Sequence, residues 1–281
     1  MEIHRQLTLA KPGQPGSVVT IGAYDGVHRG HCQVISEVCS IAVERGLRSV
    51  VVTFDRHPAS IVRPDSAPLL LTDLDQKLEH LAATGIDEAF VVPFDQKRAE
   101  ESAEEFVESV LVECLAVRAI VVGEDFHFGY QRAGNVSLLR ALGNRIGFEV
   151  LGLDLVGLDG KPVRDHEQVS STFIRRALVG GDLGRANAML GRPFELRGEV
   201  GRGDRRGTEI GFPTANIQVS PALLLPGDGV YAGWVERSDG SVPASCLLYR
   251  SDAADEGLGV GLGGRRIIKK KRGGGGGGGG G

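Results

Sequence analysis

Val18-Val-Thr-Ile21-Gly22-Ala-Tyr24-Asp25-Gly26-Val-His28-Arg-Gly30-His31 is the stretch that decides the fold of the N-terminal half of this chain. The apolar run ending at Ile21 predicts a buried β-strand, the glycines after it permit a tight turn, and the residues from Gly30 onward open a helix. Both histidines therefore lie at or just before a helix N-terminus, where unpaired N–H groups and a partial positive charge favour phosphate. The pattern predicts a binding site for a nucleotide triphosphate. The alternative is a turn that only displays two surface histidines.

Apolar strands alternate with amphipathic helices beyond this turn. Strands are predicted over residues 49–54, 89–94, 119–122 and 148–153, and helices over 72–84, capped by Thr72, and over 103–115. This order indicates an α/β domain with a mainly parallel sheet and helices on both faces. Such sheets bind ligands beyond the carboxyl ends of their strands, where the segments 22–31, 54–58 and 123–129 fall.

A second phosphate-binding pattern follows at Ser170-Ser171-Thr172-Phe-Ile-Arg175. Consecutive hydroxyl groups that open an amphipathic helix, with an arginine one turn later, can bind phosphate oxygens. Read alone, the same residues fit a serine cap and a solvated arginine. The phosphate interpretation gains weight from the two histidines upstream.

Bulk composition is that of a globular protein. The 281 residues leave room for two domains, and 41% are hydrophobic and 24% charged. We expect no membrane span, because no run of about 18 apolar residues occurs, and the N-terminus has no secretory pattern. The four cysteines lack metal-ligand and disulfide-framework spacing. A reduced, cytoplasmic protein is the expectation.

The C-terminal stretch 246–281 has unusual chemistry. It holds Lys269-Lys-Lys-Arg272 and then nine glycines, which cannot bury apolar area. Its beginning resembles translated sequencing-adapter DNA, and we interpret the whole stretch as a non-native, disordered tail. The alternative is a basic arm that binds phosphate or nucleic acid. Without residues 250–281 the formal charge is −8 rather than −4, which argues against a general nucleic-acid binder.

Together, the motifs resemble the nucleotidylyltransferase superfamily and, within it, the prokaryotic FAD synthetases. The resemblance covers about residues 16–191. The motifs that carry it, in order, are Gly22-x-Tyr24-Asp25-Gly26-x-His28-x-Gly30-His31, Phe54-x-x-His57-Pro58, Gly123-x-Asp125-Phe126-x-Phe128-Gly129 and Ser170-Ser171-Thr172-x-Ile174-Arg175. Arg56 departs from the family, because many relatives have proline there, and the resemblance assigns no flavin contact to that position.

The resemblance implies a Rossmann-like nucleotidylyltransferase domain that transfers AMP from ATP to FMN and releases Mg²⁺-pyrophosphate. It implies that positioning and charge neutralisation do the catalysis. By resemblance, the catalytic residues are His28, His31 and Arg175. The ATP-binding residues are Gly22, Tyr24, Asp25, Gly26, Gly30, Ser170, Ser171 and Thr172. The flavin-binding residues are Phe54, His57, Pro58, Asp125 and Phe128.

After residue 191 the sequence pattern changes from alternating strands and helices to stretches that alternate between apolar and polar residues. Alternating stretches at 194–200 and 229–235 are typical of antiparallel strands, and a glycine- and arginine-rich loop separates them. Its end, Gly207-x-x-x-Gly211-Phe-Pro213-Thr214-Ala-Asn216, resembles the riboflavin kinase signature of bifunctional bacterial enzymes. The resemblance implies ATP binding by Gly207, Gly211 and Pro213, Mg²⁺ ligation by Thr214 and Asn216, and riboflavin as phosphate acceptor. The alternative is a β-hairpin with a polar loop that binds neither phosphate nor metal.

The implied fold of this region is a small antiparallel β-barrel. The sequence diverges from the family after about Pro243 and offers no glutamate as general base, so we expect a partial barrel without kinase activity. The predicted divisions are 1–185 for adenylyl transfer, 186–245 for the partial kinase and 246–281 for the tail.

Two rival functions stay open at this point. One is another nucleotidylyltransferase with a His-x-Gly-His motif or an aminoacyl-tRNA synthetase fragment, although the lysine-rich second signature of synthetases is absent. The other is a sensor that binds nucleotide or flavin without turnover. The expected partners are ATP, FMN and riboflavin, with no nucleic acid or membrane, and self-association is left open.

Overall fold

The computed structural model describes residues 1–154, 157, 168–201, 215–237, 240–248 and 265–269. The chain divides into two compact units, Met1–Ser171 and Thr172–Gly281. The predicted functional boundaries after residues 185 and 245 stay predictions. No helix in the described ranges is long and apolar enough to cross a membrane.

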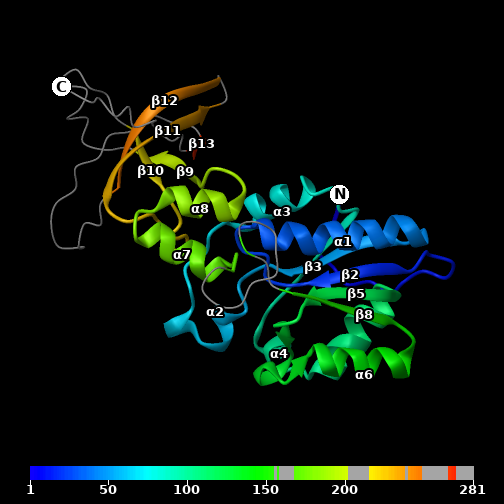
Figure 1. The fold of residues 1–281 in the computed structure, drawn as a ribbon. Helices are drawn as coiled ribbons and strands as arrows, with labels where there is room; N and C mark the ends of the chain where they lie inside the picture. Colours follow the sequence, from blue (N-terminus) through cyan, green and yellow to red (C-terminus); the bar gives the residue numbers. More distant parts are fainter. Residues whose placement is uncertain (155–156, 158–167, 202–214, 238–239, 249–264, 270–281) are drawn as a thin grey trace, which may run out of the picture. The chain divides into compact units, whose positions relative to one another are not determined.

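The first unit contains a six-stranded parallel sheet in the order β1-β4-β3-β2-β5-β8 (Figure 1). Its strands are β1 (Glu2–His4), β2 (Ser17–Ile21), β3 (Arg48–Phe54), β4 (Glu88–Val92), β5 (Val117–Gly123) and β8 (Glu149–Leu153). After β2, the chain places β3 and β4 on one side of β2 and then β5 and β8 on the other side. This reversal places a crevice beyond the carboxyl ends of the central strands. The expected α/β fold with a parallel sheet is confirmed.

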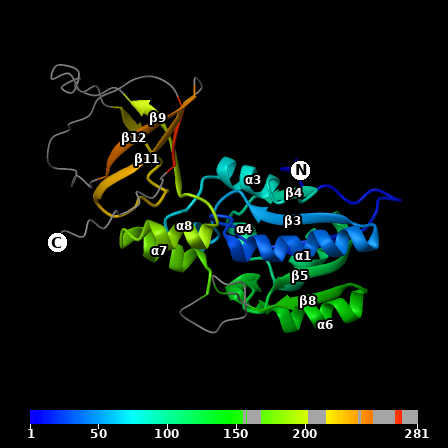
Figure 2. The ribbon, with the colours of Figure 1, turned by 45° about the horizontal axis from the view of Figure 1, so that its top comes forward.

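Helices cover both faces of this sheet (Figures 1 and 2). One face packs against α1 (Arg29–Arg45) and α3 (Leu74–Ala82), and the other against α5 (Ala103–Phe106), the π-helix Val107–Cys114 and α6 (Val136–Ile146). Two consecutive residues of β2 show that both faces are buried: Val18 belongs to the core under α1, and Val19 belongs to the core under α6. Successive side chains of a strand point to opposite faces, so both must be apolar when both faces are covered.

Shorter elements complete the first unit. They are α2 (Ala59–Val62), the 3₁₀ turns Pro64–Ser66 and Tyr130–Arg132, α4 (Gln96–Ala99), and the paired strands β6 (His127–Phe128) and β7 (Gly134–Asn135).

Two helix predictions need correction. The helix predicted over 72–84 is capped by Asp73 instead of Thr72: the Asp73 carboxylate accepts the Gln76 N–H at 2.7 Å. Thr72 is engaged elsewhere, since its hydroxyl oxygen accepts the Gly26 N–H at 3.1 Å. The helix predicted over 103–115 changes from α to π geometry at Val107.

The second unit begins with two helices, α7 (Ser171–Val179) and α8 (Leu183–Leu190). The boundary between the units falls after Ser171, the first residue of α7. A five-stranded antiparallel sheet follows in the order β10-β9-β13-β11-β12. Its strands are β9 (Glu195–Gly201), β10 (Asn216–Gln218), β11 (Gly229–Arg237), β12 (Gly240–Leu248) and β13 (Arg265–Lys269). The expectation of antiparallel strands in this region is confirmed.

The sheet also reaches into the stretch expected to be a disordered tail. β12 continues to Leu248, and β13 pairs with both β9 and β11. Parts of the predicted tail are thus drawn as strands of this sheet, and the non-native, disordered tail over 246–281 stays a prediction. Two adjacent isoleucines, Ile267 and Ile268, give β13 β-branched residues that favour an extended chain.

Candidate functional site

The turn between β2 and α1 has a strained backbone. Tyr24 and Val27 have φ angles of 50° and 37°, which are unfavourable for residues with a branched or bulky side chain. Tyr24 is only 3% exposed, and its hydroxyl lies 2.6 Å from Thr20 Oγ1. Burial raises the pKa of Tyr24 well above its ordinary value, so the hydroxyl stays protonated. A buried, hydrogen-bonded side chain thus helps hold the turn in a conformation it would not adopt alone.

His28 and His31 cap the N-terminus of α1 reciprocally. The His31 N–H donates to His28 Nδ1 at 3.3 Å, and the His28 N–H donates to His31 Nδ1 at 3.4 Å. The rings stack with centroids 3.5 Å apart. Gly30 permits this approach, because a Cβ there would lie 3.3 Å from the His28 ring. Since both Nδ1 atoms accept hydrogen bonds, the neutral rings carry their protons on Nε2 and keep one N–H donor each.

Asp25 has a role that sequence reasoning missed. Its buried carboxylate accepts the N–H of Leu71 at 2.9 Å and of Thr72 at 3.2 Å, which fixes the loop before α3. Its backbone carbonyl accepts the Ser171 hydroxyl at 2.8 Å. Asp25 therefore connects the turn to two distant segments, and it does not line the cavity described next.

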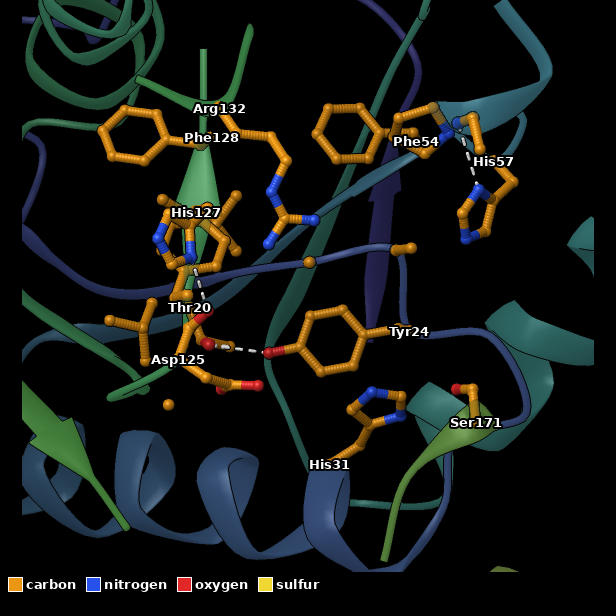
Figure 3. Close-up of a pocket in the computed structure, with 18 of the residues that line it drawn as sticks. Thr20, Tyr24, His31, Phe54, His57, Asp125, His127, Phe128, Arg132 and Ser171 are labelled. Atoms are coloured by element: carbon orange, nitrogen blue, oxygen red, sulfur yellow. Dashed lines mark hydrogen bonds between the residues drawn. The ribbon is translucent and has the colours of Figure 1, made fainter. Parts of the chain in front are cut away.

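A cavity of about 710 Å³ opens at the carboxyl ends of the strands of the first unit. Its volume is in the range of small-ligand sites. It brings together most residues that sequence reasoning selected for adenylyl transfer, and Figure 3 shows several of them around one space. These are Gly22, Tyr24, His28, Gly30, His31, Phe54, His57, Pro58, Asp125, Phe128, Ser170 and Ser171.

Four residues of the adenylyl-transfer prediction lie elsewhere. Asp25 and Gly26 are in the turn but do not line the cavity, and Thr172 and Arg175 belong to the second unit. Arg175 lies on α7 one helical turn after Ser171, so the two residues share a side of that helix.

Aromatic rings line another part of the cavity in two groups. Phe54 meets Phe94 edge to face at 5.2 Å, and Phe126 stacks on Phe128 at 5.4 Å. Phe106 lies 6.1 Å from Phe128. Only Phe54 and Phe128 were among the predicted flavin residues. Such walls suit a flat, apolar ring system.

His57 and Asp125 follow β3 and β5, the two strands on either side of β2 in the sheet. His57 Nδ1 accepts the Ala59 N–H at 3.1 Å, a contact that starts α2 (Figure 3). The Asp125 backbone carbonyl lies 2.8 Å from His127 Nδ1. A Cβ at Gly123 would lie 2.8 Å from Asp125 Oδ1, so a larger residue here would displace the Asp125 carboxylate from its present position.

Sequence reasoning also missed the cations of the cavity. Arg63, Arg98 and Arg132 line it, and Arg98 is paired with Glu101 at 2.6 Å. The Arg132 guanidinium extends into the cavity (Figure 3) and makes no hydrogen bond or ion pair with the described residues. The sequence alone does not show whether the side chain of a loop arginine points into a cavity or toward solvent.

The loop that carries Arg132 is held in an unusual conformation. Gln131 and Arg132 have φ angles of 51° and 60°. Gly129 and Gly134, on either side, pack so closely on Ala103 that a Cβ at either would come within 2.7 Å of it. The bracketing glycines thus press the loop onto the start of α5 and direct Arg132 inward.

The kinase prediction is only partly open to inspection. Gly207, Gly211, Pro213 and Thr214 lie outside the described residues. Asn216 begins β10, opposite Gly201 on β9, and is half-buried. Its proposed role as a metal ligand stays a prediction.

Comparison with known families gives two matches. The FAD synthetase family matches residues 10–173, and the riboflavin kinase family matches residues 190–253. The second match runs past the predicted end of the kinase region at 245.

Individual relatives extend over most of the chain. A bifunctional riboflavin kinase/FMN adenylyltransferase of Pseudomonas fluorescens is 37% identical over 86% of this chain and 76% of its own length. The protein of the same description from Escherichia coli K12 is 38% identical over 80% and 69%. A solved structure described as a macrolide-efflux protein of Streptococcus pneumoniae has a TM-score of 0.77 and 25% identity, and the match covers 96% of this chain and 89% of that one. The efflux description applies to that protein.

Proposed function

Because this chain belongs to the family of bifunctional riboflavin kinase/FMN adenylyltransferases, we propose that its first unit transfers AMP from ATP to FMN. The products are FAD and pyrophosphate. One observation carries the proposal: a single cavity holds the paired imidazoles at the start of α1 and the aromatic walls around Phe54 and Phe128. A triphosphate fits the first feature and an isoalloxazine ring fits the second.

In the proposed reaction an FMN phosphate oxygen bonds to the α-phosphorus of ATP while the bond to the bridging α–β oxygen breaks. The electron pair of that bond leaves with pyrophosphate. The Nε2–H groups of His28 and His31 donate to the triphosphate oxygens where negative charge develops. Both donors are oriented beforehand by the reciprocal caps on Nδ1.

The departing β- and γ-phosphates are assigned to the start of α7. Ser170 and Ser171 line the cavity, and Arg175 follows on the same side of that helix as Ser171. If Arg175 binds both ATP and pyrophosphate, Arg175→Ala will raise the KM for ATP and also lower kcat.

We assign the FMN phosphate to Arg132. This phosphate is a dianion that must approach a second polyanion, so a cation has to offset the repulsion. An inward-pointing guanidinium without a described partner supplies two parallel N–H donors for phosphate oxygens.

The second unit is proposed to derive from a riboflavin kinase. Thr214 and Asn216 offer a hydroxyl and an amide oxygen, which are ligand types that Mg²⁺ accepts. Mg²⁺, when bound, would neutralise triphosphate charge at either site. We propose that this chain does not phosphorylate riboflavin, because it offers no glutamate equivalent to the family's general base.

The proposed setting is the cytoplasm. Cys32, Cys39, Cys114 and Cys246 are free thiols, which supports a reducing compartment.

The test is incubation with ATP and Mg²⁺, with and without FMN. FMN-dependent pyrophosphate release and FAD formation support the proposal. Binding of ATP and flavin without release would indicate a sensor instead, and release that depends on an amino acid would indicate a synthetase. FMN formation from riboflavin and ATP would contradict the proposed loss of kinase activity.

A further inference from the structure

Lys77 is a buried cation beside the cavity that the proposed mechanism does not use. It lies on α3 and is 7% exposed. Its Nζ donates to the Phe54 carbonyl at 2.7 Å, to Thr53 Oγ1 at 3.1 Å and to the Ala23 carbonyl at 3.3 Å. Three acceptors match the three hydrogens of an ammonium group, and none of the three is charged.

These acceptors come from two segments that contribute different features of the site. Ala23 is in the turn that leads to His28, and it lines the cavity. Phe54 ends β3 and carries one aromatic wall. The Thr53 hydroxyl reinforces the link by donating to the Ala23 carbonyl at 3.2 Å. The Lys77 ammonium therefore joins the triphosphate-binding turn to the flavin-binding wall.

We propose that Lys77 is a positioning residue for adenylyl transfer, whose ammonium fixes the spacing between the turn before His28 and the end of β3. The inference rests on the proposed function. Reacting atoms must approach within about 3–3.5 Å in line, and a misplacement of about 1 Å costs about 10²-fold in rate. A neutral amine has only two N–H donors, so loss of the proton leaves one of three buried acceptors without its donor.

The charge state of Lys77 is sensitive to pH. Burial lowers its pKa to about 8, and the carboxylates of Asp25 and Asp55 oppose this only in part. Both carboxylates are engaged with other groups: Asp25 accepts from Leu71 and Thr72, and Asp55 accepts the Phe94 N–H and pairs with Arg56. The link is therefore complete at neutral pH and is lost as the pH rises through about 8.

The experiment measures FMN-dependent pyrophosphate release between about pH 6.5 and pH 9.5 for the wild type, Lys77→Met and Lys77→Arg. We expect kcat of Lys77→Met to fall about 10- to 100-fold, with the KM for ATP changed by less than about threefold. The wild type should lose activity above about pH 8, and Lys77→Met should lack this limb. Lys77→Arg keeps its charge and, where it folds, should retain activity above pH 8.

Leu78→Ala is the matched control. Leu78 is the next residue on α3 and is also buried. It belongs to the apolar core that also includes Tyr24 and Val27 of the turn, but its side chain has no hydrogen-bonding group and so cannot form the polar link. This variant should melt earlier and keep the wild-type kcat and pH profile below its melting temperature. A Lys77→Met enzyme with wild-type kcat and pH profile would overturn the inference. So would a Leu78→Ala enzyme that reproduces the loss.

Hydrogen exchange separates this inference from the proposed function. An inactive wild type would contradict the proposed adenylyl transfer, whereas the amides of residues 22–28 report on the link directly. Faster exchange there in Lys77→Met than in Leu78→Ala supports the positioning role, and equal exchange rejects it.

Discussion

The two sheets of this molecule gather their motifs in different ways. In the parallel sheet, β2, β3 and β5 end at one edge, so the segments 22–31, 54–58 and 123–129 meet around one cavity. In the antiparallel sheet, neighbouring strands run in opposite directions, and the strand between β9 and β11 comes from residues 265–269.

This difference shows which kind of site can be predicted from strand order. A parallel sheet brings every strand-to-helix turn to the same edge, so a motif after one strand meets motifs after its neighbours. An antiparallel sheet distributes its turns over both edges. Which segment fills a place in it depends on pairing with distant partners, and a short β-branched stretch such as β13 can do so.

The largest expected effect tests whether the parallel sheet edge is the reaction centre. His28→Ala or His31→Ala should lower kcat for adenylyl transfer by roughly 10² or more, because each removes a preorganised donor, the acceptor of the other residue's N–H and the ring stacked on the other imidazole. Steady-state pyrophosphate release measures this. His127→Ala is the control, since His127 also lines the cavity but bonds locally to Asp125. Equal losses in all three variants would reject the special role of the pair.

A second measurement concerns the stability of the parallel sheet. An unfolded lysine keeps its proton to about pH 10.4, whereas folded Lys77 releases it near pH 8. Between these values the unfolded chain binds more protons, so Lys77 raises the free energy of unfolding as pH rises, by up to about 3 kcal/mol.

Urea unfolding of the wild type and Lys77→Met at about pH 7.5 and pH 10 measures this effect. The difference between the two proteins cancels contributions from the second unit. The wild type should gain relative to the variant at the higher pH. No relative gain would mean that Lys77 stays charged in the fold throughout this range and would contradict its lowered pKa.

The next smaller effect is expected for Arg132→Gln, which tests the proposed contact between Arg132 and the FMN phosphate. We expect the KM for FMN to rise about tenfold, equivalent to about 1.4 kcal/mol, because one phosphate contact is lost. The KM for ATP should change little. Fluorescence titration should show weaker binding of FMN and unchanged binding of riboflavin, which lacks the phosphate.

Arg63→Gln serves as the comparison, because Arg63 also lines the cavity without a described partner. If both variants weaken FMN equally, the arginines act through a general positive field and Arg132 has no specific phosphate contact.

The smallest expected effect on adenylyl transfer comes from deleting residues 265–281. This removes β13 and leaves edges of β9 and β11 unpaired, so proteolysis within 172–248 should accelerate. The adenylyl-transfer rate should stay within about twofold, since a unit with its own core can keep its fold. A large loss of this activity would show that the two units do not act independently.

How far the site could be predicted varies from residue to residue. His28, His31 and Gly30 were predictable because the strand, the turn and the helix start are adjacent in sequence. Asp25 belongs to the same motif, yet its carboxylate serves the loop at Leu71 and Thr72. Nothing in the sequence distinguishes Lys77 from a solvated helical lysine, because its three acceptors are brought to it by the packing of α3 on the sheet.

The sequence by itself determined the local order of this protein: apolar strands, capped helices and the phosphate-binding turns between them. Those features depend on neighbouring residues and on backbone preferences. Only the tertiary structure decided which aromatic rings share a wall, where Arg132 points and what Lys77 joins. Such contacts join residues far apart in the chain, and their partners are set by how whole elements pack.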